Sequence, residues 1–325
     1  MFLSVVVPCY NEEQSVPALV QRLAKVIAPW KDRAEILLVD DGSCDATWAA
    51  IEAARAGCPQ LQGIRLSGNR GHQIALTAGL EAARGERILM LDADLQDPPE
   101  LLGDMMSLMD RGYDVVYGQR AERQGETMFK KVSAHVFYRV LNLLSDVDIP
   151  RDTGDFRLVS RRALDAVLAM PERARFVRGL FALVGFEQIA LQYRRAPREA
   201  GETKYPLKKM VRLAVDAMTA LSTKPLKIAT RMAFLSLMAA AGAVVYLVWS
   251  MVTHQTAPGW ASLFLTISIF SSIQLFTLGI MGEYIGRIYT EAKGRPLYFL
   301  SEDTRGTMAA QGTADPEVLP MRKRA

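Results

Sequence analysis

The chain has 325 residues, half of them apolar, and a formal net charge of +4. This length fits one medium domain with additions or two small domains, and the small net charge gives no support for nucleic-acid binding. The apolar fraction is higher than in an ordinary soluble enzyme and lower than in a polytopic transporter. The composition therefore indicates a soluble body with a few membrane spans.

Short apolar and β-branched runs in the first third of the chain predict β-strands at residues 2–7, 35–39, 63–66 and 87–91. Apolar residues with helical spacing lie between these runs, and this alternation predicts a parallel sheet with helices on both faces. The runs are continuous, as in strands that are buried on both faces. The same patterns predict later strands at 115–118, 153–159 and 187–193 and helices at 129–144 and 163–170.

Polar residues follow three of the predicted strands, at residues 10–12, 40–41 and 92–94. The carboxyl ends of neighbouring parallel strands meet at one edge of a sheet, and ligands of such sheets bind there. We therefore expect the three polar segments to form one site. The alternative is three unrelated turns.

Asp92 and Asp94 are two residues apart, directly after the fourth predicted strand. Two carboxylates in this position can share one Mg²⁺ or Mn²⁺ ion, which prefers oxygen ligands together with substrate phosphates, and Gln96 could add a neutral oxygen. The alternative is a turn in which an aspartate caps the strand. Asp40 and Asp41 are equally ambiguous, since they fit either a turn or hydrogen bonds to a ribose or a base.

The chain becomes basic and then strongly apolar after residue 204. Residues 205–231 combine an apolar stripe at helical spacing with basic residues off the stripe. This predicts amphipathic helices in a membrane interface, with an ordinary surface helix as the alternative. Residues 233–252 and 260–282 carry no charge and are long enough to span a bilayer, so a transmembrane hairpin is predicted at 232–288. The alternative is a buried helical pair of a soluble protein.

Basic residues flank both outer ends of the predicted hairpin. The positive-inside rule then places the domain of residues 1–204 and both termini in the cytoplasm. The last segment, 289–325, is expected to be cytoplasmic and to be disordered after about residue 301, where Gly, Thr, Pro and charged residues dominate.

Several motifs occur in order along the chain, each of them a weak signal alone. They are Pro8-Cys9-Tyr10-Asn11-Glu12-Glu13, Asp40-Asp41-Gly42-Ser43, Asn69-Arg70-Gly71-His72, Leu91-Asp92-Ala93-Asp94-Leu95-Gln96-Asp97-Pro98-Pro99, Thr153-Gly154-Asp155-Phe156-Arg157-Leu158 and Arg198-Glu199-Ala200-Gly201-Glu202-Thr203-Lys204-Tyr205. As an ordered set over about residues 2–300, they resemble family 2 glycosyltransferases with the GT-A fold. The last two motifs resemble the branch that acts on polyprenyl phosphates, which includes dolichol-phosphate mannose synthase, bactoprenol glucosyltransferases and the aminoarabinose transferases of lipid A modification.

The resemblance implies an α/β, Rossmann-like nucleotide-sugar domain ahead of the hairpin, and it implies which residues bind the donor. Asp92 and Asp94, with Gln96, would hold the diphosphate through Mg²⁺ or Mn²⁺. The full nucleotide-sugar site that it implies is Pro8, Tyr10, Glu12, Val39, Asp41, Asp92, Ala93, Asp94, Gln96, Arg120, Arg198 and Lys204.

The acceptor of this branch is itself a phosphate, so the site must hold two anions and needs additional cations. Lys130 and Lys131, together with Arg198 and Lys204, are the candidates to bind the lipid phosphate. The alternative for each of these residues is a solvated surface charge.

Asp155 and Asp94 are the candidate catalytic residues. The resemblance implies that Asp155 is a base, yet a phosphate monoester has a second pKa of roughly 6 and is largely ionised at neutral pH. Asp155 is therefore expected either to act as the base or to position the acceptor or a metal-bound water. His72 is another candidate base, and the alternative for it is a structural hydrogen-bond donor.

The resemblance implies an inverting, metal-dependent enzyme that moves a sugar from a nucleotide, UDP rather than GDP, to undecaprenyl or another polyprenyl phosphate. The expected product serves the modification of a cell-envelope glycan or lipid. The expected location is the bacterial inner membrane, and the expected assembly is a homo-oligomer such as a tetramer. The sequence leaves the identity of the sugar open.

Two other functions are compatible with parts of the pattern. A processive polysaccharide synthase would share the early motifs, but residues 192–196 lack the Trp of its Gln-x-x-Arg-Trp signature, and two spans are too few for a polymer channel. A non-catalytic nucleotide-binding scaffold in the membrane would not need the intact pair of Asp92 and Asp94.

Overall fold

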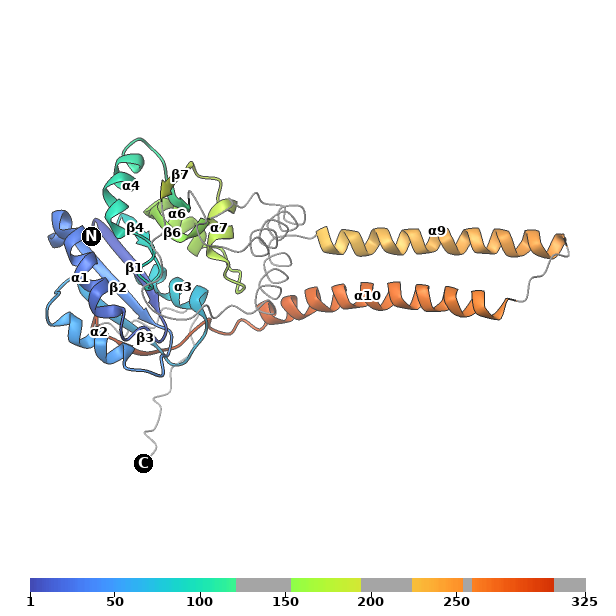
Figure 1. Ribbon diagram of the computed structural model, residues 1–325, viewed down its shortest axis with the longest axis horizontal. Helices are drawn as coiled ribbons and strands as arrows, with labels where there is room; N and C mark the ends of the chain where they lie inside the picture. Colours follow the sequence, from blue (N-terminus) through green and yellow to red (C-terminus); the bar gives the residue numbers. More distant parts are fainter. Residues whose placement is uncertain (121–152, 194–223, 254–258, 307–325) are drawn as a thin grey trace, which may run out of the picture.

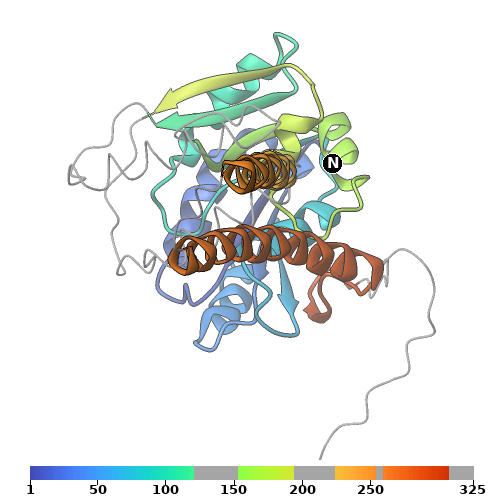
Figure 2. The ribbon, with the colours of Figure 1, turned by 90° about the vertical axis from the view of Figure 1, so that its right-hand side faces the viewer.

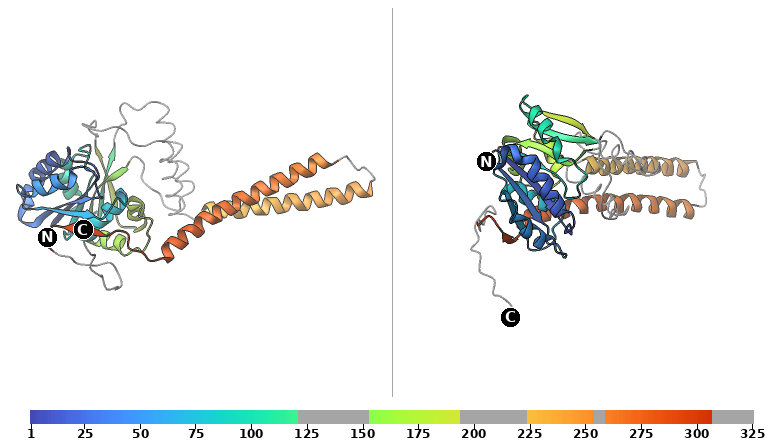
Figure 3. Two further views of the ribbon diagram at one scale, coloured as in Figure 1. Left: turned by 90° about the horizontal axis from the view of Figure 1, so that it is seen from below. Right: turned by 60° about the vertical axis from the view of Figure 1, so that its left-hand side comes forward.

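The computed structural model describes residues 1–120, 153–193, 224–253 and 259–306. Within these residues the chain forms an α/β domain around one sheet, and two long helices project from the domain (Figure 1). Further views show the same two helices extending away from the domain (Figure 3).

The sheet is mixed, with the strand order β7-β5-β6-β4-β1-β2-β3-β8. Its strands are β1 (Leu3–Cys9), β2 (Ala34–Asp40), β3 (Leu61–Leu66), β4 (Arg87–Met90), β5 (Val115–Arg120), β6 (Thr153–Ser160), β7 (Gln188–Tyr193) and β8 (Leu300–Asp303). The predicted parallel arrangement is confirmed for the neighbours β4, β1, β2 and β3. The strand predicted at 153–159, for which the sequence indicates no direction, is β6 and runs antiparallel to β4 and β5, and β8 runs antiparallel to β3. Local sequence patterns miss this because the direction of a strand depends on its neighbours in the sheet.

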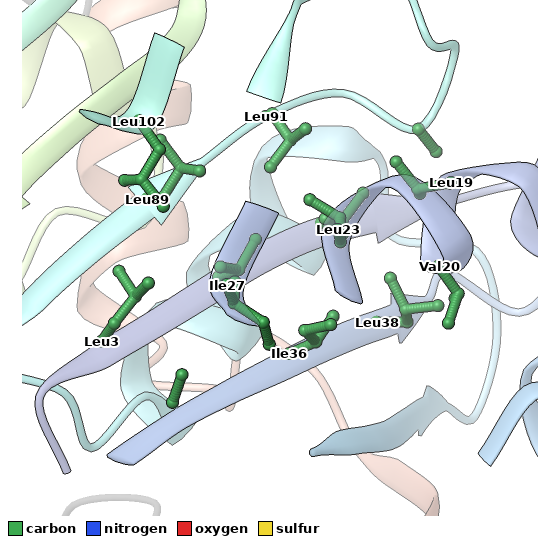
Figure 4. Close-up of a cluster of buried hydrophobic side chains, with 14 of the residues drawn as sticks. Leu3, Leu19, Val20, Leu23, Ile27, Ile36, Leu38, Leu89, Leu91 and Leu102 are labelled. Carbon is green, nitrogen blue, oxygen red and sulfur yellow. The ribbon is translucent and has the colours of Figure 1, made fainter. Parts of the chain in front are cut away.

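Helices cover both faces of the sheet. The domain contains α1 (Val16–Ile27), the 3₁₀ turn η1 (Ala28–Arg33), α2 (Thr47–Arg55), α3 (His72–Ala82), the 3₁₀ turn η2 (Pro99–Leu101), α4 (Leu102–Met109), α6 (Arg161–Leu168) and α7 (Val177–Leu183). Because successive strand residues face opposite sides, Ile36 and Leu38 pack with Leu23 of α1, as Figure 4 shows. Leu37 instead packs in the cluster formed with α3, α6 and α7, which includes Phe181. The helix predicted at 163–170 is α6, and the helix predicted at 129–144 lies outside the described residues.

Gly79 allows α3 to lie close against β1 and β2. A Cβ atom at this position would meet Cγ1 of Val6 and would lie 2.9 Å from Cγ2 of Val39. We expect Gly79→Ala to lower the free energy of unfolding by about 1–3 kcal/mol, the usual cost of overpacking, as measured by urea denaturation. Gly103→Ala is the matched control, because a Cβ atom at this α4 position would have no atom within 4 Å. An equal loss of stability in both variants would contradict close packing at Gly79.

Helices α9 (Lys224–Val252) and α10 (Trp260–Ala292) lie side by side. Their segments Leu226–Ser250 and Leu265–Ala292, of 25 and 28 residues, are long and apolar enough to cross a membrane, by length and composition. The predicted spans at 233–252 and 260–282 fall inside the two helices. The sequence places residues 224–231 in the interfacial region, but they are the first turns of α9, and 205–223 lie outside the described residues.

Large apolar side chains on both helices face outward. Leu235 and Val245 of α9 are 66% and 69% exposed, and Leu275 of α10 is 69% exposed. Soluble monomeric proteins rarely expose contiguous apolar surface on this scale, so the two helices require an apolar environment or a partner.

The chain returns to the domain after α10 and adds β8 to the edge of the sheet. Glu302 accepts a hydrogen bond from Trp48 Nε1 at 3.1 Å and pairs with Arg65 at 3.0 Å. Arg305 Nη1 donates to the carbonyl oxygen of Ala82 at 3.0 Å. The described structure therefore continues to Gly306, beyond the boundary near residue 301 after which disorder was predicted, and 307–325 lie outside it.

Candidate active site

The register of the sheet places Asp92 beside Asp155. β4 and β6 are antiparallel, and Met90, the last residue of β4, lies opposite Arg157. Continuing this register by two residues in each strand brings the chain after β4 beside an earlier part of β6. Asp92 and Asp155 occupy these positions at the carboxyl end of β4. The polar segment 92–94, which was expected at this edge, therefore lies beside Asp155 from a distant part of the sequence.

Asp155 is a buried carboxylate surrounded by hydrogen-bond donors. His72 Nε2 lies 3.1 Å and Gln73 Nε2 lies 2.9 Å from its Oδ2, and Arg178 Nε lies 3.2 Å from its Oδ1. Burial alone would raise the pKa of Asp155, but Arg178 and His72 outweigh burial and hold this pKa well below its usual range. A carboxylate with such a low pKa is a weak base, so this geometry favours positioning over proton abstraction.

His72 lies between the two aspartates. Its Nε2 is 3.1 Å from Asp155 Oδ2 and 3.5 Å from Asp92 Oδ1, and its side chain is 41% exposed. Burial lowers the pKa of His72, but the hydrogen bond to Asp155 and the charge of Asp92 raise it, to about 9. The imidazole is therefore protonated at neutral pH and is a donor here rather than a free base.

The raised pKa of His72 predicts a pH-dependent contribution to stability. Because its pKa is higher in the folded protein than the roughly 6.5 of an unfolded chain, the contribution is complete below pH 6.5 and is lost as the pH rises through about 9. In metal-free protein, the melting temperature of the wild type should fall more between pH 6.5 and 9.5 than that of His72→Gln. Parallel melting curves for the two proteins would contradict the raised pKa.

The carboxylate oxygens at this edge suit a hard divalent cation. Asp92 Oδ1 is buried, and within the described part of the chain it has no hydrogen-bond partner. Burial raises the pKa of Asp92 to about 6, the nearby carboxylates Asp155, Asp97 and Asp94 add to the rise, and His72 opposes it. A cation beside Asp92 would relieve this repulsion. The residues therefore fit a metal ion, as the sequence predicts.

The structure brings together a ligand set that differs from the predicted one. Within the described ranges, possible ligand atoms of His72, Asp92 and Asp155 lie within 4.8 Å of one another. The predicted set of Asp92, Asp94 and Gln96 lies on one turn, where Asp94 Oδ1 accepts a hydrogen bond from the Gln96 backbone at 3.1 Å. Asp155 is already engaged by Arg178, so the predicted set is chemically the better one for Mg²⁺ or Mn²⁺.

The residues predicted to bind the nucleoside lie at the carboxyl ends of β1 and β2. Tyr10 is 43% exposed and available to a ligand, whereas Val39 is fully buried and only its backbone could contact one. Glu12 Oε2 accepts a hydrogen bond from the Ser15 hydroxyl at 2.8 Å. Pro8 and Ala93 are buried, which leaves their predicted contacts to the backbone as well.

Asp41 connects this region to α3. Its two carboxylate oxygens accept hydrogen bonds from the backbone N–H groups of Arg70 and Gly71, at 2.7 and 2.8 Å. Burial raises the pKa of Asp41, and these two hydrogen bonds oppose the rise. Asp41 therefore holds the loop that leads into His72, a role in addition to the predicted contact with the nucleoside.

The predicted cations are only partly covered by the structure. Arg120 ends β5, near Thr153 of β6, and hydrogen-bonds to the side chain of Tyr193. Lys130, Lys131, Arg198 and Lys204 lie outside the described residues.

The sequence does not predict a role for Gln73 or Arg178, the two further residues that contact Asp155. Arg178 interrupts the otherwise apolar helix α7, which is a weak signal that could have drawn attention to it. Gln73 follows the candidate base His72 directly, but nothing in the local sequence indicates that it points at Asp155.

Residues 4–168 match the protein family described as Glycosyl transferase family 2. Over 302 residues, 92% of this chain and 93% of the relative, the chain is 47% identical to the uncharacterized glycosyltransferase YkcC of Bacillus subtilis (strain 168). It is 34% identical to the SfII prophage-derived bactoprenol glucosyl transferase of Shigella flexneri, over 94% of this chain and 99% of that protein. Among solved structures, the mannosyltransferase PcManGT of Pyrobaculum calidifontis, in complex with GDP-Man and Mn²⁺, is 18% identical with a TM-score of 0.44, over 87% of this chain and 86% of that one. The chain is therefore a member of glycosyltransferase family 2, with a GT-A-like mixed sheet, and its full-length relatives include proteins named as bactoprenol glucosyl transferases.

Proposed function

We propose that the protein transfers a sugar from a nucleotide sugar to a polyprenyl phosphate, with inversion at the sugar carbon. The observation that carries this proposal is the position of His72 between Asp92 and Asp155, 3.5 and 3.1 Å from their carboxylate oxygens, at the carboxyl edge of a GT-A-like sheet. The near full-length relatives named as bactoprenol glucosyl transferases favour a polyprenyl phosphate as the acceptor. The bacterial sources of several of these relatives favour UDP as the nucleotide.

Asp92 and Asp94, with Gln96, would hold Mg²⁺ or Mn²⁺ at this edge. When bound there, the ion would stabilise the charge that builds on the departing nucleoside diphosphate. When protonated, His72 adds a positive charge on the same side of Asp92, where it can stabilise the same anion. The nucleoside would lie toward Tyr10, at the ends of β1 and β2.

The acceptor phosphate needs no strong base, because its second pKa is roughly 6 and it is ionised at neutral pH. The low pKa of Asp155 suits this reaction, since a permanently ionised carboxylate can orient neighbouring groups without taking up the proton. The phosphate oxygen attacks the sugar carbon from the face opposite the departing diphosphate. A single displacement of this kind inverts the configuration of that carbon.

The hairpin of α9 and α10 is the proposed membrane anchor. Its exposed apolar side chains match a bilayer core, and Lys227 and Arg231 on one helix and Arg287 on the other lie toward the outer ends. This arrangement favours a cytoplasmic domain at an inner membrane.

Arg173 donates its backbone N–H to Glu291 Oε1 at 2.8 Å, so the end of α10 contacts the loop before α7 and thus lies near the site. In Figure 2 both helices lie in front of the domain, with α9 seen nearly end-on and α10 seen obliquely. A homo-oligomer, such as a tetramer, packed through these helices stays a prediction.

The proposal is tested with the purified full-length chain in lipid nanodiscs that contain undecaprenyl phosphate. A panel of radiolabelled UDP- and GDP-sugars is supplied with Mg²⁺ or Mn²⁺, and label is measured in the solvent-extracted lipid. We expect transfer from one donor, complete loss of transfer with excess EDTA, and recovery when the divalent ion is restored.

The assay also separates the alternatives. Label in products that grow in length would identify a processive polysaccharide synthase. Nucleotide binding without turnover of any donor would identify a non-catalytic scaffold. Transfer that persists in EDTA would contradict the metal requirement.

A further inference from the structure

Three elements converge on the carboxylate of Asp155. Asp155 lies in β6, Gln73 is the second residue of α3, and Arg178 is the second residue of α7. The side chain of Asp155 is only 5% exposed. Its orientation is therefore set by the protein and not by water.

Gln73 uses both ends of its amide. Its Nε2 donates to Asp155 Oδ2 at 2.9 Å, and its Oε1 accepts the backbone N–H of Val177 at 2.9 Å. The N–H of Val177 belongs to the first turn of α7, where backbone donors have no partner within the helix. Gln73 thus ties the start of α3 to the start of α7 and at the same time holds one oxygen of Asp155.

Arg178 holds both oxygens of Asp155 in the fork of its guanidinium group. Its Nε lies 3.2 Å from Oδ1 and its Nη2 lies 3.3 Å from Oδ2, while Nη1 donates to the carbonyl oxygen of Thr153 at 3.2 Å. A two-point contact of this kind fixes the plane of a carboxylate, which a single point charge cannot do. The third contact anchors Arg178 to the start of β6.

We propose that Gln73 and Arg178 are positioning residues for sugar transfer, which act by fixing the Asp155 carboxylate in one orientation beside His72 and Asp92. This inference rests on the proposed function, because it assigns Asp155 to the site where transfer occurs. Gln73 and Arg178 hold Asp155 of β6, whereas the residues predicted to bind the nucleoside lie at the ends of β1 and β2. Loss of Gln73 or Arg178 should therefore affect the transfer step and leave binding of the nucleotide unchanged.

The test uses the full-length chain in nanodiscs and compares Gln73→Leu and Arg178→Lys with two matched controls. Gln188→Leu removes a glutamine that donates to the carbonyl oxygen of Phe181 at 2.6 Å, and Arg162→Lys changes an exposed arginine whose fork holds the buried carboxylate of Asp114. For each protein, kcat, the KM for the donor and the melting temperature are measured. In parallel, hydrolysis of the donor by water is measured without any lipid acceptor.

We expect kcat to fall about 100-fold in Gln73→Leu, as for a reacting group displaced by about 1 Å, with the KM for the donor unchanged. Arg178→Lys keeps the charge but not the fork, so we expect a fall of about 10-fold. Millimolar guanidinium should partly restore kcat in Arg178→Ala, which a merely structural role would not allow. The controls should keep the kcat of the wild type at a similar melting temperature.

Wild-type kcat in both site variants would overturn the inference, and so would a fall in kcat matched by the controls. If no lipid is labelled but hydrolysis of the donor falls in the site variants alone, the positioning role is supported and the proposed acceptor is wrong. A wild-type protein that turns over no donor in either assay would overturn both the inference and the proposed function.

Discussion

Replacing Asp92 with asparagine is expected to reduce sugar transfer by about 1000-fold or more. The change removes one charge from the oxygens that face the proposed divalent ion, while the shape of the side chain is kept. Metal stabilisation of a leaving group amounts to several kcal/mol, and each 1.36 kcal/mol changes the rate tenfold. The measurement is kcat for transfer of label into lipid, with binding of Mn²⁺ followed by electron paramagnetic resonance as a second readout.

Asp104→Asn is the matched control for this experiment. Asp104 is an exposed aspartate in α4, and we expect its replacement to leave both readouts unchanged. Normal transfer and normal Mn²⁺ binding in Asp92→Asn would show that Asp92 is not a metal ligand. Loss of transfer with unchanged Mn²⁺ binding would point instead to its contact with His72.

The second large effect is expected from Asp155→Asn, on stability as well as on activity. The neutral amide removes the buried counterion that Arg178 and His72 share, while these two side chains are themselves partly exposed. Breaking a buried ion pair by removing one partner usually costs about 3–5 kcal/mol of unfolding free energy, and partial solvation of the remaining cations places the expected loss at the lower end of this range. Because the acceptor would also lose its fixed neighbour, kcat should fall by about 100-fold or more.

The ion pairs of Asp155 also make the stability of the protein depend on pH. The pKa of Asp155 is lower in the folded protein than the roughly 3.9 of an unfolded chain, so its contribution to stability is present above pH 3.9 and is lost as the pH falls below that value. The difference in stability between wild type and Asp155→Asn should therefore be full at neutral pH and should shrink in acid. It is measured by urea denaturation at several pH values.

Asp165→Asn provides the control for Asp155. Asp165 pairs with Arg161 at 3.5 Å on the surface of α6, and its side chain is 60% exposed. Such a pair contributes only about 0–1 kcal/mol, so this variant should be nearly as stable as the wild type. If Asp155→Asn were equally mild at neutral pH, the ion pair network around Asp155 would be unimportant for the fold.

The first half of the fold could be predicted because its signals are local. Each of β1, β2 and β4 is a continuous apolar run, and the helices between them carry apolar stripes. By contrast, β6 lies between β4 and β5 because of contacts between distant strands, and a short stretch of sequence carries no information about these contacts. The strand β8 was missed because the polar composition after residue 301 outweighed the apolar residues just before it. Its partners on β3 are more than 200 residues away in the sequence.

The candidate site shows the same division between local and distant information. Asp92 and Asp94 follow a recognisable strand, so their place at the edge of the sheet follows from the sequence. The contact of Asp155 with Gln73 joins residues that are 82 positions apart, and it depends on the register between β4 and β6. No periodicity in the sequence encodes that register. Arg178 could be assigned only once α7 was seen to begin beside β6.

The two apolar helices interrupt the catalytic domain instead of ending it. β7 precedes α9, and β8 follows α10 and joins the same sheet beside β3. In topological terms the hairpin is an insertion between two strands of one sheet. A chain cut before α9 would lose an edge strand together with the contacts of Glu302 to Trp48 and Arg65. A water-soluble form of the domain would therefore require the hairpin to be excised and bridged by a linker, with β8 kept in place.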